Sequence, residues 1–189
     1  MTDYDQYFDY LMHRSRLGEL YRKYLLYPRL VKRLRGTTLD IGCGIGDMLA
    51  FRPNTVGTDI NIHTVDYCNA KGLKAHLMQP NVLPFDDDSF ESILLDNVLE
   101  HVISPEYLLD EVRRVAKPGG GLLVGVPGRL GWHSDVDHKI FYDETDLRNR
   151  IELHGFSHEE TFYSPLWGAQ WLSEKVRQYC VYSLFSKDA

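Results

Sequence analysis

A segment rich in glycine carries the first sign of chemistry in this chain. Residues 39–47 read LDIGCGIGD, with an apolar run before the glycines and a helical fragment, residues 47–51, after them. Glycine has no Cβ, so a turn built from glycines lets the backbone approach a bound ligand closely. In a parallel sheet such a turn lies at the carboxyl ends of the strands, where ligands bind. The segment therefore predicts a ligand-binding turn.

A carboxylate further along the chain narrows the class of ligand. Residues 55–60 read TVGTDI, a second apolar run that ends with Asp59. At the end of the second strand of such a fold, a carboxylate can accept hydrogen bonds from both hydroxyls of a ribose. The glycine turn and Asp59 together predict a ligand that contains adenosine.

The spacing of the glycines separates two adenosine ligands. Dinucleotide sites use G-x-G-x-x-G and rest the pyrophosphate on a helix N-terminus. This chain has G-x-G-x-G, and Asp47 stands where the last glycine of the dinucleotide pattern would be. A carboxylate there repels a pyrophosphate, whereas S-adenosylmethionine has no phosphate and carries ammonium and sulfonium cations. The turn between Asp40 and Asp47 therefore favours S-adenosylmethionine, and an NAD-dependent oxidoreductase is the less favoured alternative.

These segments resemble class I S-adenosylmethionine-dependent methyltransferases, in particular the small-molecule type related to quinone-biosynthesis methyltransferases. The run LDIGCGIG resembles their first motif, VGTDIN the second, and residues 83–124 the later motifs in order. The likeness is close over about residues 38–126. It implies an α/β, Rossmann-like, doubly wound fold with a mostly parallel seven-stranded sheet and an antiparallel last strand. It also implies methylation of a small molecule by S-adenosyl-L-methionine, which leaves S-adenosyl-L-homocysteine.

The resemblance also implies which residues bind the cofactor. Asp40, Gly42 and Gly44 would line the methionine part of the cofactor, and Asp59 would bind the ribose. The family usually has an acidic residue shortly before the LPF run, near the adenine amino group. Gln79 stands at that position here, and Asn81 is the alternative. Two more approach mainly through their backbone at the end of the fourth strand. The full set is Asp40, Gly42, Gly44, Asp59, Ile60, Gln79, Asn81, Asp96 and Asn97. Only twelve residues separate Gly46 from Asp59, so the first helix should be short.

Methyl transfer requires mainly that nucleophile and methyl group are held in line. A hydroxyl acceptor is helped by a general base, for which histidine is the common choice. The family builds its acceptor site in the loop after the fifth strand, so His133 and His138 are the leading candidates, and His101 after the fourth strand is a third. Each histidine also has an ordinary structural interpretation. The expected acceptor is a hydroxyl on a saccharide, a lipid-linked compound or a quinone-like precursor.

Strands that alternate with helices predict the sheet that positions these residues. The spacing predicts strands at 38–42, 55–60, 73–78, from 92 and 121–128, with closing strands at 156–164 and 181–187. Residues 1–35 are rich in tyrosine and then basic, with apolar residues at helical spacing. This helical segment either packs across the edge of the sheet or covers the pocket as a lid.

Length and composition are those of one globular domain, residues 1–189. Within it we expect an N-terminal helical segment (1–35), a cofactor-binding half (36–127) and a segment with the acceptor loop and closing strands (128–189). A net charge of −6 argues against a nucleic-acid partner. No apolar run is long enough for a membrane span and no signal peptide is evident, so a cytoplasmic location is expected.

No metal site is expected. The three cysteines lack CxxC spacing, and the acidic run at residues 86–88 is typical of a solvated turn. The expected partner is a small-molecule acceptor, and the oligomeric state is left open. A further alternative is a non-catalytic protein that binds the cofactor or its product while it serves a partner protein. Its sign would be a broken glycine motif, and here the motif is intact.

Overall fold

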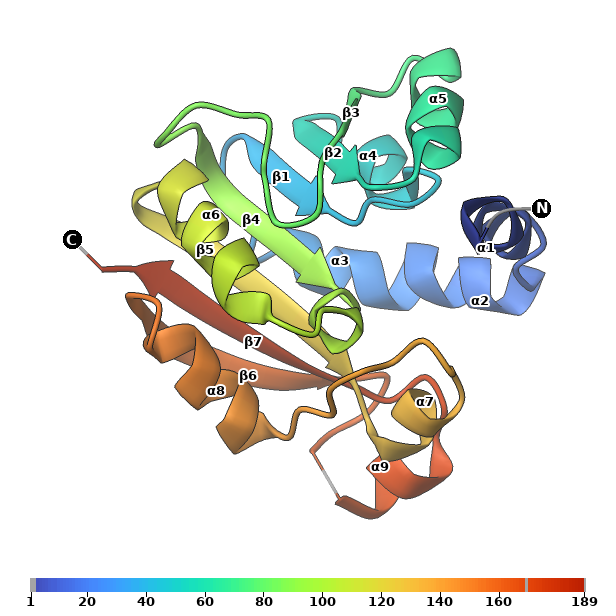
Figure 1. Ribbon diagram of the computed structural model, residues 1–189. Helices are drawn as coiled ribbons and strands as arrows, with labels where there is room; N and C mark the ends of the chain where they lie inside the picture. The colour runs from blue at the N-terminus through green and yellow to red at the C-terminus, as the bar shows by residue number, and fades with distance from the viewer. Residues whose placement is uncertain (1–2, 169, 189) are drawn as a thin grey trace.

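In the computed structural model, which describes residues 3–168 and 170–188, seven strands form one sheet in the order β3-β2-β1-β4-β5-β7-β6 (Figure 1). Neighbouring strands from β3 to β5 are parallel, while β7 runs antiparallel to both β5 and β6. The prediction of a Rossmann-like sheet with an antiparallel last strand is confirmed. The strands are β1 (Thr38–Ile41), β2 (Thr55–Asp59), β3 (Ala75–Leu77), β4 (Phe90–Asp96), β5 (Ala116–Pro127), β6 (Phe156–Ser164) and β7 (Cys180–Lys187).

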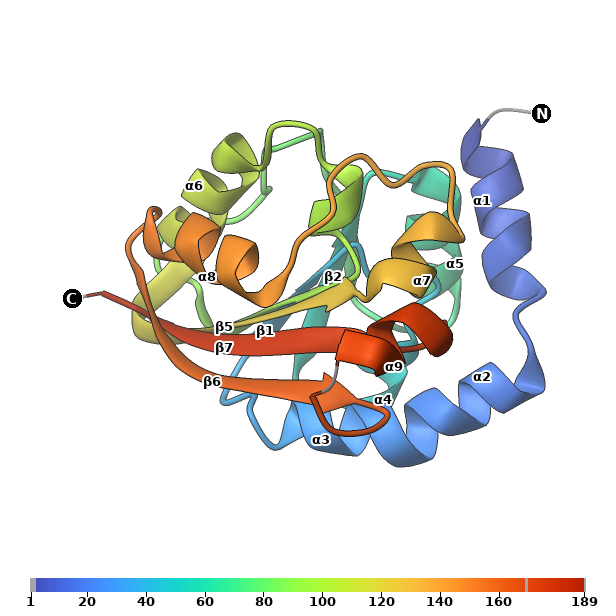
Figure 2. The same cartoon turned by 90° about the horizontal axis from the view of Figure 1, so that it is seen from below.

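Helices cover both faces of this sheet, with α6 and α8 on one face and α3 and α4 on the other (Figure 2). The central strands β4 and β5 are apolar on both faces, as parallel strands between two helical layers must be. The α-helices are α1 (Asp3–Met12), α2 (Arg16–Tyr21), α3 (Tyr27–Val31), α4 (Asp47–Phe51), α5 (Ile62–Ala70), α6 (Pro105–Val115), α7 (Arg129–His133), α8 (Glu144–Glu152) and α9 (Gln170–Lys175). A π-helical segment, η1 (Arg22–Leu26), and a 3-10 helix, η2 (Leu99–His101), complete the set.

The two helical layers bury separate groups of apolar side chains. Ile93 and Leu95 of β4 pack in the cluster that includes α6 and α8, while Leu94 between them packs against α3 and α4. Successive residues of a strand point to opposite faces, so the alternation follows from the backbone alone. Each face of the sheet therefore has its own apolar core, and a smaller third cluster packs between α4, α5 and β3.

The N-terminal segment does not pack across the edge of the sheet, because α3 packs on one face of it, against the central strands β4 and β5. Leu30 of α3 is buried against the sheet with Leu94 and Leu123, whereas α1 and α2 extend beyond the carboxyl ends of the strands. The π-helical segment joins them just before Pro28, where the N–H of Tyr27 bonds the carbonyl of Arg22. Proline has no N–H to continue the ordinary pattern, so a local change of helix type is expected there.

The bounds of α4 and α6 follow from local features of the sequence. Helix α4 has only five residues, which confirms the short first helix. Ser104 and Pro105 begin α6, although the Ser104 side chain makes no capping hydrogen bond. Helix α6 ends at Val115, and β5 begins at the next residue. Of the helices in the described part of the chain, none is long and apolar enough to cross a membrane.

Candidate active site

A cavity of about 560 Å³ lies at the carboxyl ends of β1, β4 and β5. Five parts of the chain surround it: the glycine turn after β1, the N-terminal segment, the residues that follow β4, the loop after β5, and the start of β7 with the residues just before it. Residues that line it include Tyr7, Tyr10, Leu11, Arg14, Tyr21, Arg22, Asp40, Gly42, Gly44, Asp96, Asn97, Glu100, His101, Asp135, His138 and Tyr182. The cavity thus joins the predicted cofactor turn to two of the three predicted histidines.

The glycine turn has a backbone that other residues adopt only with strain. Gly42, Gly44 and Gly46 have φ values of 72°, 54° and 79°, in the left-handed region. A Cβ on Gly42 would also lie 2.8 Å from a methyl carbon of Val98. The N–H of Gly42 donates to the carbonyl of Thr58 at 2.8 Å, which ties the turn to β2. The glycines are therefore required by the shape of the turn.

Asp59 fastens this turn from the neighbouring strand. One carboxylate oxygen accepts the N–H of Gly44 and the other accepts the N–H of Asn61, both at 2.9 Å. The residue is 5% exposed, and α1 lies beside it, since the Asn61 amide donates to the Tyr4 carbonyl at 2.9 Å. Asp59 is not among the residues that line the cavity. Its role as ribose acceptor stays a prediction.

The other residues expected near the adenosine also lie apart from the cavity. Among the described residues that line it, none is Ile60, Gln79 or Asn81. Gln79 and Val82 form an isolated bridge between them, and Asn81 has a φ of 59°. The cavity therefore contains the predicted methionine end of the site, and the adenosine end stays a prediction.

Buried carboxylates give the cavity its electrostatic character. Burial is the main cause that raises the pKa of Asp40 well above 3.8, and the neighbouring charges of Asp96 and Asp59 add to the rise. Burial also raises the pKa of Asp96, whose Oδ1 accepts hydrogen bonds from the Tyr182 hydroxyl at 2.8 Å and the Asn97 amide at 2.9 Å. Because like charges this close disfavour ionisation, a cation bound beside them would be stabilised.

Two arginines that the sequence analysis did not single out also line the cavity. Arg14 lies 2.6 Å from Asp47 and Arg22 lies 3.5 Å from it, measured between side-chain nitrogen and carboxylate oxygen. Asp47 also lines the cavity, and its carboxylate is paired with these two arginines. The Nη2 of Arg22 is buried and makes no hydrogen bond within the described structure. Arg14 lies in the link between α1 and α2, and Arg22 begins η1.

The loop after β5 brings one of its two candidate histidines to the cavity. His138 and His101 line it, with ring centroids 4.7 Å apart, whereas His133 on α7 is not among the lining residues. The Nδ1 of His138 lies 2.7 Å from the Trp132 carbonyl. Since a carbonyl only accepts, Nδ1 carries the proton, and the Nε2 of the neutral ring has a free lone pair.

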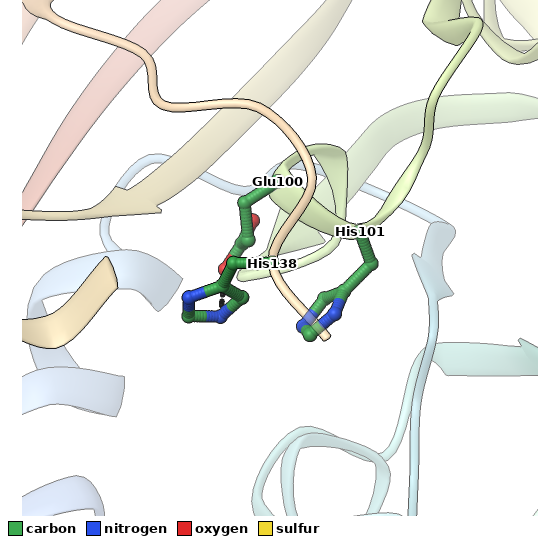
Figure 3. A group of neighbouring side chains, drawn as sticks. All are labelled: Glu100, His101 and His138. Carbon is green, nitrogen blue, oxygen red and sulfur yellow. Dashed lines mark ion pairs between the residues drawn. The ribbon is translucent and has the colours of Figure 1, made fainter. Parts of the chain in front are cut away.

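Glu100 also lines the cavity beside these histidines, and it is not among the site residues predicted from the sequence. The side chain is completely buried, and neither carboxylate oxygen has a hydrogen-bond partner within the described structure. Burial raises its pKa to about 8. Its Oε1 lies 3.8 Å from the Nε2 of His138, and Figure 3 shows the three side chains directed toward one region. Its position directly before His101 was the only signal in the sequence.

Comparison with known proteins agrees with the fold and with the cofactor implied by the sequence. Residues 39–124 match the model of a methyltransferase domain family. This match identifies residues 39–124 as a methyltransferase domain. A Mycolicibacterium smegmatis protein described as an S-adenosylmethionine-dependent methyltransferase is 29% identical over 153 residues, which are 74% of this chain and 60% of that relative. The ubiquinone/menaquinone biosynthesis C-methyltransferase of Desulfotalea psychrophila is 30% identical over 95 residues, 45% of this chain and 39% of the relative.

The fold of this methyltransferase chain has a full-length counterpart among solved structures. A chain in the complex between the Haloferax volcanii Trm112 methyltransferase activator and a methyltransferase superposes with a TM-score of 0.77 at 17% identity, covering 100% of this chain and 99% of the other. The match over residues 39–124 and the S-adenosylmethionine-dependent relative confirm the resemblance and its cofactor, S-adenosylmethionine. The chain spans about 60% of the length of the Mycolicibacterium relative, so reaction and acceptor are matters for proposal.

Proposed function

We propose that this protein transfers the methyl group of S-adenosylmethionine to a hydroxyl oxygen of a small molecule. The acceptor classes that we favour are a saccharide, a lipid-linked compound and a quinone-like precursor. One observation carries the proposal: a single cavity is lined both by the glycine turn and by His101 and His138. A donor on the turn and an acceptor beside the histidines would share that cavity, as an in-line displacement requires.

The charged groups of the cavity complement the methionine end of the cofactor. That end carries an ammonium, a carboxylate and the reactive sulfonium. Asp40 and Asp96 offer buried carboxylates to the two cations, and the free Nη2 of Arg22 offers a donor to the carboxylate. Both kinds of charge are thus provided on one side of the cavity, which supports this ligand over a diphosphate.

The histidines offer proton acceptors on the acceptor side. Burial, followed by the nearby His138, lowers the pKa of His101, so its ring is neutral at physiological pH. The hydrogen bond to the Trp132 carbonyl leaves the Nε2 lone pair of His138 available. A neutral imidazole near a hydroxyl can accept its proton as the oxygen attacks the methyl carbon. Methylation of oxygen is therefore the reaction that this side of the cavity supports.

Calorimetry with S-adenosylhomocysteine tests the cofactor half of the proposal. Purified protein should bind about one equivalent per chain. Incubation with methyl-labelled S-adenosylmethionine and fractionated cell extract then tests the transfer. Label should appear in small-molecule fractions that resist protease and nuclease, in a form stable to treatment that cleaves esters. The Asp40→Asn variant, which keeps the size of the side chain, is the matched control for both steps.

Three outcomes of this experiment would contradict the proposal in different ways. Absence of heat with S-adenosylhomocysteine would remove the cofactor from the cavity. Cofactor binding without transfer to any fraction would favour the non-catalytic alternative, in which the bound chain serves a partner protein. Label that enters the protein or nucleic-acid fraction would show that the acceptor class is wrong.

A further inference from the structure

We propose that Glu100, His101 and His138 bind one divalent transition-metal ion, Zn²⁺ by preference, at the acceptor end of the cavity. The inference rests on the proposed function for the identity of the acceptor, and it changes the role of the two histidines from proton acceptors to metal ligands. No metal site is predicted from the sequence, because the three ligands come from two segments that are distant along the chain. The structure brings the segments together (Figure 3).

The geometry of the three side chains is close to what one ion requires. One ligand atom from each residue can be chosen so that all lie within 4.8 Å of one another, and the Glu100–His138 pair is already at 3.8 Å. Ligands around a tetrahedral zinc ion at ~2.0–2.1 Å are about 3.4 Å apart. Small side-chain rotations therefore suffice to close the remaining gap.

Glu100 is the independent observation that points to a ligand. A completely buried carboxylate normally has hydrogen-bond partners, because burying one without them is costly. Glu100 has none for either oxygen within the described structure, although it is directed toward His138. A metal ion between them would satisfy the carboxylate and stabilise its charge.

The surroundings of His138 prepare its ring for a metal. Its Nδ1–H donates to the Trp132 carbonyl at 2.7 Å, and this leaves Nε2 as the ligand atom. Metal-bound histidines usually have such a hydrogen bond on their other nitrogen, since it fixes the tautomer and the ring orientation. The His138 side chain is only 8% exposed, so the ring is also held by packing.

The composition of the cluster selects the kind of ion. Two imidazoles and one carboxylate suit Zn²⁺ and related first-row ions, whereas Mg²⁺ and Ca²⁺ prefer oxygen ligands. Three protein ligands leave a coordination position open, as in catalytic zinc sites. That position faces the cavity, because all three residues line it.

An ion there would activate the acceptor. A hydroxyl bound to Zn²⁺ has a lowered pKa and loses its proton to water. Its oxygen then forms a bond to the methyl carbon of the cofactor. The bond from that carbon to sulfur breaks and its electron pair stays on sulfur, which gives S-adenosylhomocysteine and the methylated acceptor. No electron is gained or lost by the ion.

Titration with Co²⁺, followed by visible absorption, tests the site without any acceptor. Tag-free protein is first dialysed against a chelator. We expect about one equivalent of Co²⁺ per chain, displaced by Zn²⁺ and not by Mg²⁺. Glu100→Gln, His101→Asn and His138→Asn should each weaken Co²⁺ binding at least tenfold, while His133→Asn, a histidine of the same loop that is not among the cavity-lining residues, should bind like the wild type.

S-adenosylhomocysteine calorimetry on the same samples separates folding and cofactor binding from metal binding. Variants that keep cofactor affinity but lose Co²⁺ would support the metal site. Wild-type protein that binds S-adenosylhomocysteine but no stoichiometric Co²⁺ would overturn it and leave the proposed function intact. Glu100→Gln and His138→Asn that bind Co²⁺ like the wild type, or a His133→Asn variant that loses it equally, would also overturn the inference.

Discussion

The N–H of Lys139 donates a hydrogen bond to the carbonyl of Glu100 at 2.7 Å, and the next N–H, from Ile140, reaches the same oxygen at 3.1 Å. These two bonds fasten the loop after β5 to η2, which follows β4. Because His138 directly precedes Lys139, they also bring its ring beside His101 and Glu100. One carbonyl oxygen thus aligns two segments that come from different strands.

Asp40→Asn should change stability and cofactor binding in opposite directions. Burial and two nearby carboxylates make ionised Asp40 unfavourable in the free protein, and asparagine removes that charge at almost the same volume. We expect a Tm rise of about 2–4 °C, the shift that ~1 kcal/mol produces in a domain of this size. S-adenosylmethionine should bind at least tenfold more weakly, about 1.4 kcal/mol. Thermal shift and calorimetry measure the two effects, and a variant that lost both stability and affinity would contradict the expectation.

The same carboxyl makes stability depend on pH. The pKa of Asp40 is near 3.8 in the unfolded chain and lies well above that in the folded chain. Between these two pKa values, the folded chain holds a proton that the unfolded chain has lost. The contribution of Asp40 therefore destabilises the free protein progressively as pH rises through that interval. Urea unfolding at several pH values should show this fall, and the fall should be smaller in Asp40→Asn. If the free energy of unfolding fell equally with pH in the wild type and in Asp40→Asn, the assignment of this effect to Asp40 would be contradicted.

Arg22→Ala should weaken binding of S-adenosylhomocysteine by about tenfold, or ~1.4 kcal/mol. The unpartnered Nη2 of Arg22 is the donor that we assign to the cofactor carboxylate. Lys23→Ala is the matched control, because Lys23 is a neighbouring, exposed cation that does not line the cavity. Calorimetry on both variants provides the comparison. Equal losses would mean that only the overall charge matters.

Asp59→Ala should weaken cofactor binding by an order of magnitude or more, about 1.4 kcal/mol or above. The structure adds a second effect, because the Gly44 and Asn61 N–H groups would lose their acceptor. Each lost hydrogen bond to a charged group costs ~1.5–3 kcal/mol, so unfolding should also become easier. Asp66→Ala on the exposed face of α5 should change neither property. Unchanged affinity in the Asp59 variant, measured by calorimetry, would remove this residue from the site.

Leu30→Ala should destabilise the protein by about 2–5 kcal/mol, the usual cost of a large-to-small change in a core. Leu30 is 0% exposed where α3 packs on the sheet, whereas Leu17 on α2 is 80% exposed. Leu17→Ala should therefore stay within ~0.5 kcal/mol of the wild type. Urea unfolding measures both. A small effect at Leu30 would mean that the N-terminal segment is not part of the cooperative fold.

Local signals in the amino-acid sequence were enough to predict the fold and the glycine turn that we assign to the methyl donor. Apolar runs and glycines at residues 38–60 specify a strand, a left-handed turn and a second strand whatever lies elsewhere. The short α4 followed directly from the spacing between Gly46 and Asp59. The helical character of the N-terminal segment followed from its periodicity.

Which functional side chains come into contact is visible only in the folded chain. The ion pair between Arg14 and Asp47 is not evident from the sequence, because the two residues are distant along the chain. Likewise, the sequence does not show that His138 lines the cavity while His133 is not among the lining residues. Glu100 had no pattern of its own, and its burial beside His138 depends on hydrogen bonds between distant segments. Contacts between such distant segments depend on how the loops fold over the end of the sheet. The spacing of apolar residues reports only on local helices and strands, so it cannot predict these contacts.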